Sequence, residues 1–297
     1  MLWIPVTIGA ATAQLARNAL QSGLTGTVGT LGATMVRFLY AIPFAFAAYG
    51  LALALGEPRP GFSLALAGWA ALGAVVQIAA TALMLKAMHM RGFAVAYAYI
   101  KTEPVLLALG GWWLLGDVLP PLAWAGIVLA TAGVTWSALP RGGGLAALRG
   151  EAGPVAFGIL GGAMFGLSSL AFRAAILTLE GAAPWMAALH VMCFVLTAQT
   201  ALLLGWLWFT DRRVIGATLA ARRPSLGAGF AGALATMLWF TGFALTAAAN
   251  VRTLGLVEMP LAALVNRRVS GKALGAREWA GIALVTAGIA LLVRSAA

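Results

Sequence analysis

The stretch "WAGIVLATAG" (residues 124–133) recurs near the end of the chain as "WAGIALVTAG" (279–288), with eight of the ten positions identical. Each copy lies in an apolar run that is rich in Ala and Leu and lacks a period of two, which predicts a helix rather than a strand. Similarity at the same offset of 155 residues extends through both halves of the chain. Residues 1–139 and 154–297 are therefore predicted to be two copies of one unit, joined by a linker loop at 140–153.

The composition points to a membrane protein. Of the 297 residues, 62% are hydrophobic and 9% are charged, and the mean hydropathy is +0.95. A soluble domain carries about 25% charged residues, so this chain has too little polar surface to face water on all sides. Its length accommodates about ten membrane-spanning helices of ~20 residues each.

The apolar runs, separated by short segments rich in Gly and Pro, predict an all-α integral membrane protein with ten transmembrane helices. An odd number of helices in each copy makes the two copies lie in opposite orientations, as two five-helix inverted repeats. Transporters with this symmetry bind substrate near the membrane midplane, where the repeats meet. The predicted helices are 3–20, 30–54, 65–88, 93–115, 121–139, 155–179, 184–209, 226–248, 251–269 and 276–294.

Two long stretches carry a resemblance to a known family. They are "LMLKAMHMRGFAVAYAYIKTEPVLLALGGWWLLGD" (83–117) and "LWFTGFALTAAANVRTLGLVEMPLAALV" (238–265), and each is followed by a copy of the repeated motif. Together they resemble the EamA group of the drug/metabolite transporter superfamily. The resemblance implies a ten-helix secondary transporter in a bacterial-type inner membrane. It also implies export of a small metabolite, such as an amino acid or organic anion, either coupled to protons or facilitative.

The basic residues are distributed unevenly between the two sides of the predicted membrane. Of the 19 Lys and Arg residues, twelve fall in loops on one side, four lie within spans, and Arg59, Arg252 and Arg294 fall on the other side. Because cytoplasmic loops carry the excess of Lys and Arg, this count places both termini outside the cytoplasm. The resemblance implies the opposite orientation. The net charge of +11 therefore indicates membrane orientation rather than nucleic-acid binding.

Six charged residues fall within predicted spans, where each costs about 2.5–3.5 kcal/mol on insertion scales. Glu103 and Glu258 are repeat mates, which means that they occupy equivalent positions in the two predicted copies. Pro104 and Pro260 follow them closely and are the predicted bend points. They are interpreted either as a substrate- or proton-binding pair or as carboxylates that lock helices to arginines. Four bases and two acids favour an anionic or zwitterionic solute if all face one cavity. The six are Arg17, Arg37, Lys101, Glu103, Arg173 and Glu258.

The basic members of this set have competing interpretations. Lys101 precedes Glu103 by two residues and so points to another helix face; it is expected to extend toward the cytoplasmic helix end. Arg37 and Arg17 lie toward the same membrane side. The guanidinium group of Arg37 is expected to bind either the substrate or Glu103. Arg173 lies near a span end and is expected to extend toward the interface.

Five uncharged candidates complete the predicted binding and coupling site. His190 is interpreted as a proton relay or, alternatively, as a histidine bonded to a neighbouring helix. Gln14 and Gln77 belong to helices that the resemblance places at the cavity. Tyr99 and Trp239 are candidates for stacking on an aromatic solute, with ordinary packing as the alternative.

The glycines of both copies predict close helix packing rather than chemistry. Gly126 and Gly133 of the first motif, like Gly281 and Gly288 of the second, are spaced by seven residues, so each pair lies on one helix face. In the resembled family these helices form a static scaffold and a possible dimer face. The chain is therefore expected to be a monomer or a homodimer in the lipid bilayer.

No cofactor, metal site or enzymatic activity is predicted. The single cysteine excludes an internal disulfide and an all-Cys site, and the two histidines make a His-rich site improbable. The sequence contains no HExxH, GxSxG or P-loop pattern. The remaining alternatives to a metabolite carrier are a lipid flippase or channel-like pore of the same fold and, less favoured, an intramembrane enzyme.

Overall fold

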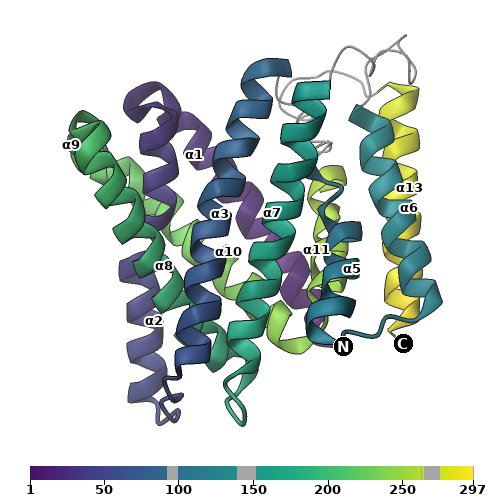
Figure 1. Ribbon diagram of the computed structural model, residues 1–297, viewed down its shortest axis with the longest axis horizontal. Coiled ribbons are helices and arrows are strands. Elements are labelled where there is room, and N and C mark those ends of the chain that lie inside the picture. The colour runs from purple at the N-terminus through teal and green to yellow at the C-terminus, as the bar shows by residue number, and fades with distance from the viewer. Residues whose placement is uncertain (92–99, 139–151, 262, 264–274, 297) are drawn as a thin grey trace. The chain divides into compact units, whose positions relative to one another are not determined.

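A computed structural model describes residues 1–91, 100–138, 152–261, 263 and 275–296, and most of these residues are helical (Figure 1). These residues contain no strand, in agreement with the predicted class. Six helical segments among them are long and apolar enough to cross a membrane by length and composition. The chain thus fits a multi-pass membrane protein.

The helices have the following bounds. They are α1 (Trp3–Leu39), α2 (Ile42–Ala54), α3 (Leu64–Arg91), α5 (Glu103–Leu115), α6 (Pro121–Ala138), α7 (Ala152–Leu177), α8 (Pro184–Thr210), α9 (Arg212–Ala220), α10 (Arg222–Leu245), α11 (Ala248–Leu254), the 3-10 helix η2 (Gly255–Val257) and α13 (Ala276–Ser295).

Two compact units divide the chain, and each takes segments from both halves of the sequence. The α6–α13 unit comprises Met1, Val75–Leu170 and Thr246–Ala297. The α1–α10 unit comprises Leu2–Ala74 and Ala171–Leu245. The compact units therefore differ from the two sequence repeats, whose boundaries remain a prediction.

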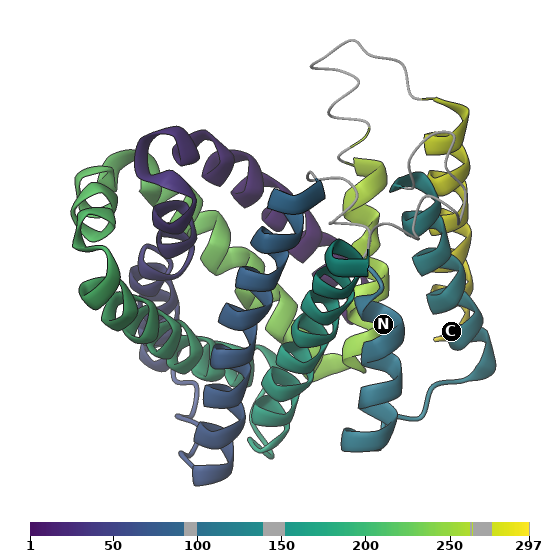
Figure 2. The ribbon, with the colours of Figure 1, turned by 45° about the horizontal axis from the view of Figure 1, so that its top comes forward.

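In the α6–α13 unit, the two copies of the repeated motif pack against each other (Figures 1 and 2). A Cβ atom added to Gly126 would lie 2.6 Å from the carbonyl oxygen of Gly288, and one added to Gly133 would lie 2.8 Å from that of Gly281. The helices run antiparallel, because the earlier residue of α6 meets the later residue of α13. Only glycine permits so close an approach of two backbones.

In the α1–α10 unit, α1 packs against α8, α9 and α10, and α2 packs against α8 and α10. α1 has a kink at Gly29, whose φ of 70° and ψ of 174° lie in a region open essentially to glycine alone. A second interruption, at Tyr40, separates α1 from α2. It is held by a hydrogen bond from Tyr40 Oη to the Thr218 carbonyl (3.0 Å), and Gly229 of α10 packs directly on the Tyr40 backbone.

Two predicted boundaries near the amino terminus were wrong. The helices expected at 3–20 and 30–54 form a nearly continuous segment, Trp3–Ala54, of 52 residues. At 1.5 Å per residue it measures about 78 Å, more than twice the ~30 Å hydrocarbon thickness. The kink at Gly29 falls between the two expected helices, so glycine geometry rather than a polar loop separates them.

Two further expectations are corrected by the same structure. The expected connection at 210–225 contains α9. This helix is capped by Asp211, whose side chain accepts a hydrogen bond from the Arg213 amide (3.1 Å). The helix expected at 251–269 begins as α11 and changes to 3-10 geometry at Gly255–Val257. The remainder of that prediction lies partly outside the described residues. The other described helices agree with prediction to within a few residues, except in the predicted span 93–115.

Replacing Gly126 by Ala is expected to lower the melting temperature of the purified protein. The new methyl group would meet the Gly288 carbonyl and the Leu292 amide at 2.6 and 2.9 Å, and backbone atoms cannot move aside as a flexible side chain can. Overpacking of this kind costs about 1–3 kcal/mol. The matched control is Gly205→Ala in α8, where a Cβ atom meets nothing within 4 Å. Equal melting temperatures for both variants would contradict close packing of α6 on α13.

Candidate functional site

The candidate site lies in the α6–α13 unit, at a break in the helix predicted over 93–115. Residues 101–102 form a turn, and α5 begins at Glu103 with Pro104 in its first turn. Proline suits a helix start because the amide hydrogen it lacks would have no partner there. Gly162 of α7 packs against this break, and a Cβ atom on it would lie 2.6 Å from the Ile100 carbonyl oxygen. The prediction of one continuous helix was therefore wrong at this turn.

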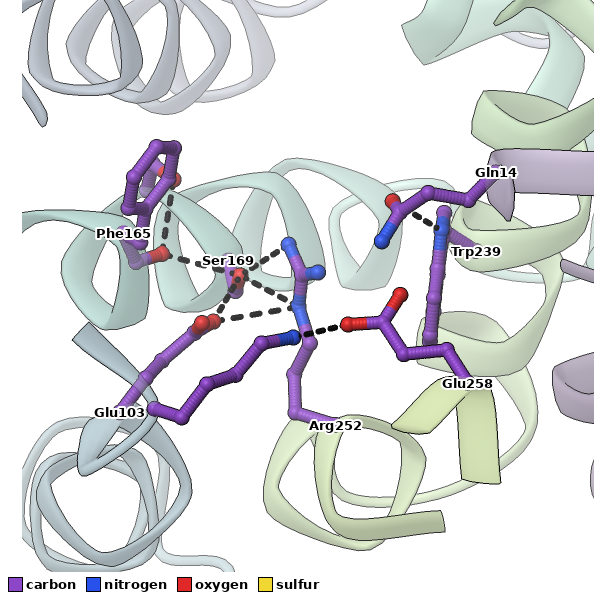
Figure 3. Close-up of polar contacts among 9 residues, drawn as sticks. Gln14, Glu103, Phe165, Ser169, Trp239, Arg252 and Glu258 are labelled. Carbon is purple, nitrogen blue, oxygen red and sulfur yellow. Dashed lines mark hydrogen bonds and ion pairs between the residues drawn. The ribbon is translucent and has the colours of Figure 1, made fainter. Parts of the chain in front are cut away.

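Arg252 of α11 joins Glu103 and α7 (Figure 3). Its Nε lies 3.2 Å from Glu103 Oε1. The same Nε and Nη2 donate to Ser169 Oγ at 3.2 and 3.0 Å. Ser169 Oγ in turn lies 3.0 Å from the Phe165 carbonyl and 3.5 Å from Glu103 Oε1. The guanidinium thus has partners on α5 and α7, and charge-assisted bonds of this type are among the stronger ones in proteins.

Lys101 and Glu258 form the second ion pair of the site (Figure 3). Lys101 lies in the turn before α5, and Glu258 directly follows η2. The two side chains are 13% and 7% exposed. The ammonium group of Lys101 therefore meets a carboxylate within the protein, in place of the expected extension toward the helix end.

The charge quartet, defined as Lys101, Glu103, Arg252 and Glu258, carries no net charge when all four residues are ionised. Glu103 and Glu258 are both buried, at 6% and 5% exposure. A buried carboxylate without a cation is costly, so the pairing accounts for two acids in an apolar unit. The net positive tally from the sequence does not describe this group, because three of the bases it counted, Arg17, Arg37 and Arg173, belong to the α1–α10 unit.

Arg252 and Ser169 were missed as site residues. The sequence count did not place Arg252 within a span, because it lies at the very start of the helix predicted over 251–269. Ser169 has no acid or histidine nearby in the sequence, so its sequence context gives no signal. One available signal was the spacing of six residues between Arg252 and Glu258, which places a second charge in the same apolar stretch.

The α1–α10 unit holds three further candidates. Trp239 Nε1 donates to Gln14 Oε1 at 3.1 Å, and Trp239 is buried, which agrees with the packing interpretation of this ring. Arg17 is buried and donates to Asn18 Oδ1 from Nε (3.3 Å) and Nη2 (2.8 Å). Gly232 of α10 lies close to the Arg17 side chain.

Three basic residues of the same unit have partners within it. Arg173 is buried and donates to the Phe243 carbonyl, so the expectation that it extends to the interface was wrong. The Arg37 guanidinium lies 5.3 Å from the centre of the Phe38 ring. Whether Arg37 also holds Glu103 remains a prediction. His190 Nδ1 lies 2.8 Å from Tyr49 Oη, which links α8 to α2 and agrees with the alternative of a histidine bonded to a neighbouring helix.

The remaining predicted residues are Gln77, Tyr99 and Pro260. Gln77 is buried in α3, and its carbonyl accepts from Thr81 Oγ1 at 2.8 Å. Tyr99 lies outside the described residues. Pro260 is helical and follows Glu258 by two residues. Within the described part of the chain, no group of three or more His, Cys, Asp or Glu residues could hold a metal ion.

Comparison with known proteins shows similarity of fold. No known family model matches the chain, and no curated protein matches it. Among solved structures, one described only as "Crystal structure of protein" is similar with a TM-score of 0.73. That similarity covers 99% of this chain and 98% of the other at 17% sequence identity. At this level of identity the similarity shows the fold alone.

Arg252→Met and Glu103→Gln are each expected to destabilise the protein, and the double variant less than the sum of the two. Removing one partner of a buried pair leaves an uncompensated charge and costs about 3–5 kcal/mol. The coupling energy is expected to be about 1–3 kcal/mol, measured as a double-mutant cycle of unfolding free energies in detergent.

The matched control for this cycle is Glu180→Gln, an exposed acid outside the quartet, which is expected to change stability by less than about 0.5 kcal/mol. Strictly additive effects of the two quartet substitutions would mean that Arg252 and Glu103 do not stabilise each other.

Proposed function

We propose that the chain is a secondary transporter that exports a small metabolite across a bacterial-type inner membrane. In this proposal it has ten helices in two inverted five-helix repeats, as in the EamA group of the drug/metabolite transporter superfamily. The observation that carries the proposal is the placement of Glu103 and Glu258. These repeat mates are both buried, stand at helix interruptions, and are paired with bases within an apolar unit.

The packing of α6 on α13 supports the inverted repeat. Gly126 corresponds to Gly281 in the sequence repeat, and Gly133 corresponds to Gly288. The contacts join Gly126 to Gly288 and Gly133 to Gly281, so exchanging the two copies reproduces the same pair of contacts. An antiparallel contact that maps onto itself in this way is expected where two copies are related by a two-fold axis in the membrane plane.

Interrupted helices support a transport role for the charge quartet. In transporters with inverted repeats, substrate and coupling ions bind where helices are discontinuous, because charges and freed backbone groups are available there. The turn at residues 101–102 and the 3-10 segment η2 are two such interruptions in this chain. In the proposed mechanism, Pro104 and Pro260 mark the bend points as the site opens to one side and then the other. The substrate is a small amino acid or organic anion.

Purified protein in liposomes is expected to carry a metabolite of this class with saturable kinetics. Glu103→Gln is expected to lower the rate by about tenfold or more, because it removes a charge from the binding group. Uptake and efflux of radiolabelled amino acids and carboxylic acids provide the measurement, with Glu180→Gln as control. Non-saturable flux would indicate a channel-like pore instead, and movement of labelled phospholipid alone would indicate a flippase.

The proposed orientation places both termini outside the cytoplasm, as the count of basic residues predicts. Cys193 is the single cysteine of the chain, so Cys193→Ser gives a cysteine-free background. Added to it, Ala296→Cys is expected to react with a membrane-impermeant maleimide in intact spheroplasts. Ala220→Cys, at the end of α9, is expected to react only after permeabilisation. The reverse pattern would show both termini to be cytoplasmic.

A further inference from the structure

A short helix joins two candidate membrane spans in the α1–α10 unit (Figure 1). α8 ends at Thr210 and α10 begins at Arg222, and both helices are long and apolar enough to cross a membrane. At 1.5 Å per residue, the 9 residues of α9 between them measure about 14 Å, less than half of the ~30 Å hydrocarbon thickness. α9 is therefore expected to lie at the membrane surface, between the ends of the two spans.

One face of α9 is fixed against the rest of its unit. Thr218 is fully buried, and its carbonyl accepts the hydrogen bond from Tyr40 Oη (3.0 Å). A Cβ atom added to Gly32 of α1 would lie 3.0 Å from Thr218 Oγ1. Ala217 packs against a buried apolar cluster that includes Val28 of α1. These contacts hold α9 in place, so its outward side chains have a defined position.

The outward side of this connection is strongly basic. The arginine cluster, as it is named here, consists of Arg212 and Arg213 at the start of α9 and Arg222 and Arg223 at the start of α10, all of them exposed. Asp211 is the single acid in residues 211–223, and its carboxylate accepts from the Arg213 amide. Among the residues that the structure describes, no acidic side chain forms an ion pair with the cluster. Its four charges are therefore not balanced within this part of the chain.

Large apolar side chains border the arginine cluster. Trp208 and Phe209 at the end of α8 are 53% and 85% exposed, and Leu219 of α9 is 53% exposed. Arg212 Cζ lies 4.2 Å from the centre of the Trp208 ring, and Arg212 Nε donates to the Trp208 carbonyl (2.8 Å). Tryptophan and arginine at the end of an apolar span are typical of the membrane interface, where acyl chains meet headgroups. The surface therefore suits a partner that has both an apolar and an anionic part.

We propose that the arginine cluster is a binding site for anionic phospholipids. The lipid phosphate contacts the guanidinium groups, and the acyl chains contact the exposed apolar side chains. A guanidinium group binds phosphate through two parallel hydrogen bonds. Stacking on Trp208 orients the guanidinium plane of Arg212, and the bond from Nε leaves its Nη atoms for such contacts.

Charge and apolar contact each contribute to the selection of the lipid. Four arginines favour a lipid with a net negative headgroup over a zwitterionic one, because the phosphate of the latter already carries its own cation. The apolar border favours a lipid over a soluble phosphate diester, which has no acyl chains to bury. This site belongs to the α1–α10 unit, whereas the charge quartet belongs to the α6–α13 unit. The inference therefore does not depend on the proposed transport function.

The test measures lipid binding to the full-length protein in a neutral detergent. The probes are phosphatidylglycerol, phosphatidylcholine with the same acyl chains, and glycerophosphoglycerol, which is the anionic headgroup without acyl chains. Titrations followed by native mass spectrometry give the dissociation constants. The wild-type protein is expected to bind phosphatidylglycerol about tenfold or more tightly than phosphatidylcholine, because each basic residue near the membrane surface adds to the attraction of anionic lipid. Glycerophosphoglycerol is expected to bind about tenfold or more weakly than phosphatidylglycerol.

Replacing all four arginines of the cluster by glutamine is expected to reduce the preference for phosphatidylglycerol to within about threefold. Arg222→Gln/Arg223→Gln retains two of the four charges and is expected to lower the preference by about threefold. The charge-matched control is Arg59→Gln/Arg294→Gln, which removes two exposed arginines outside the cluster and is expected to keep the wild-type preference. Melting temperatures measured without added lipid show that each variant is folded.

Several results would overturn the proposal. A wild-type protein without preference for phosphatidylglycerol would do so, as would an unchanged preference in the quadruple variant. If that variant does not fold, an unchanged preference in Arg222→Gln/Arg223→Gln has the same meaning. An equal loss in this double variant and in the charge-matched control would show that overall charge attracts the lipid. Equally tight binding of glycerophosphoglycerol would show a site for soluble phosphate diesters instead of lipid.

Discussion

The need to compensate buried charge inside an apolar protein determines how the α6–α13 unit is organised. Each carboxylate of the charge quartet has a base beside it. The four residues lie in the turn before α5, at the start of α5, in α11 and directly after η2, and Ser169 of α7 is bonded to Arg252. A side chain cannot leave this arrangement alone, because its partner would remain as an unpaired charge. The quartet therefore couples elements that are distant in sequence.

Close backbone packing supplies what the hydrophobic effect supplies in a soluble protein. Lipid tails are as apolar as leucine side chains, so helices in a bilayer gain from contact chiefly where their surfaces fit closely. Gly162 permits α7 to reach the Ile100 carbonyl directly beside the quartet, and Gly166 places the same helix close to Glu103. The small residues thus position the ionised ones, since a larger side chain on α7 would push the interrupted segment away.

Much of the helical content could be predicted from the sequence, because long apolar runs without alternation have one ordinary outcome in a membrane. The bounds of α6 and α8 agree with prediction to within one residue. The kink at Gly29 was not predicted, because a glycine in an apolar run gives no sign of its backbone angles. Glu103 and Glu258 were found through the sequence repeat. Arg252 was missed because a charge near a predicted span end is counted as a loop residue, and its pairing with Glu103 depends on a contact across about 150 positions.

The contact between α6 and α13 has the form of an isologous interface folded into a single chain. In such an interface one surface meets its own equivalent, so every residue takes part twice. Gly126 and Gly281 occupy equivalent positions, as do Gly133 and Gly288. The contact of Gly126 with Gly288 is therefore repeated by the contact of Gly281 with Gly133. Because the two copies are now separate stretches of one polypeptide, each can mutate independently, yet the shared surface fits only if both change in concert. This constraint gives a physical reason for the near identity of "WAGIVLATAG" and "WAGIALVTAG".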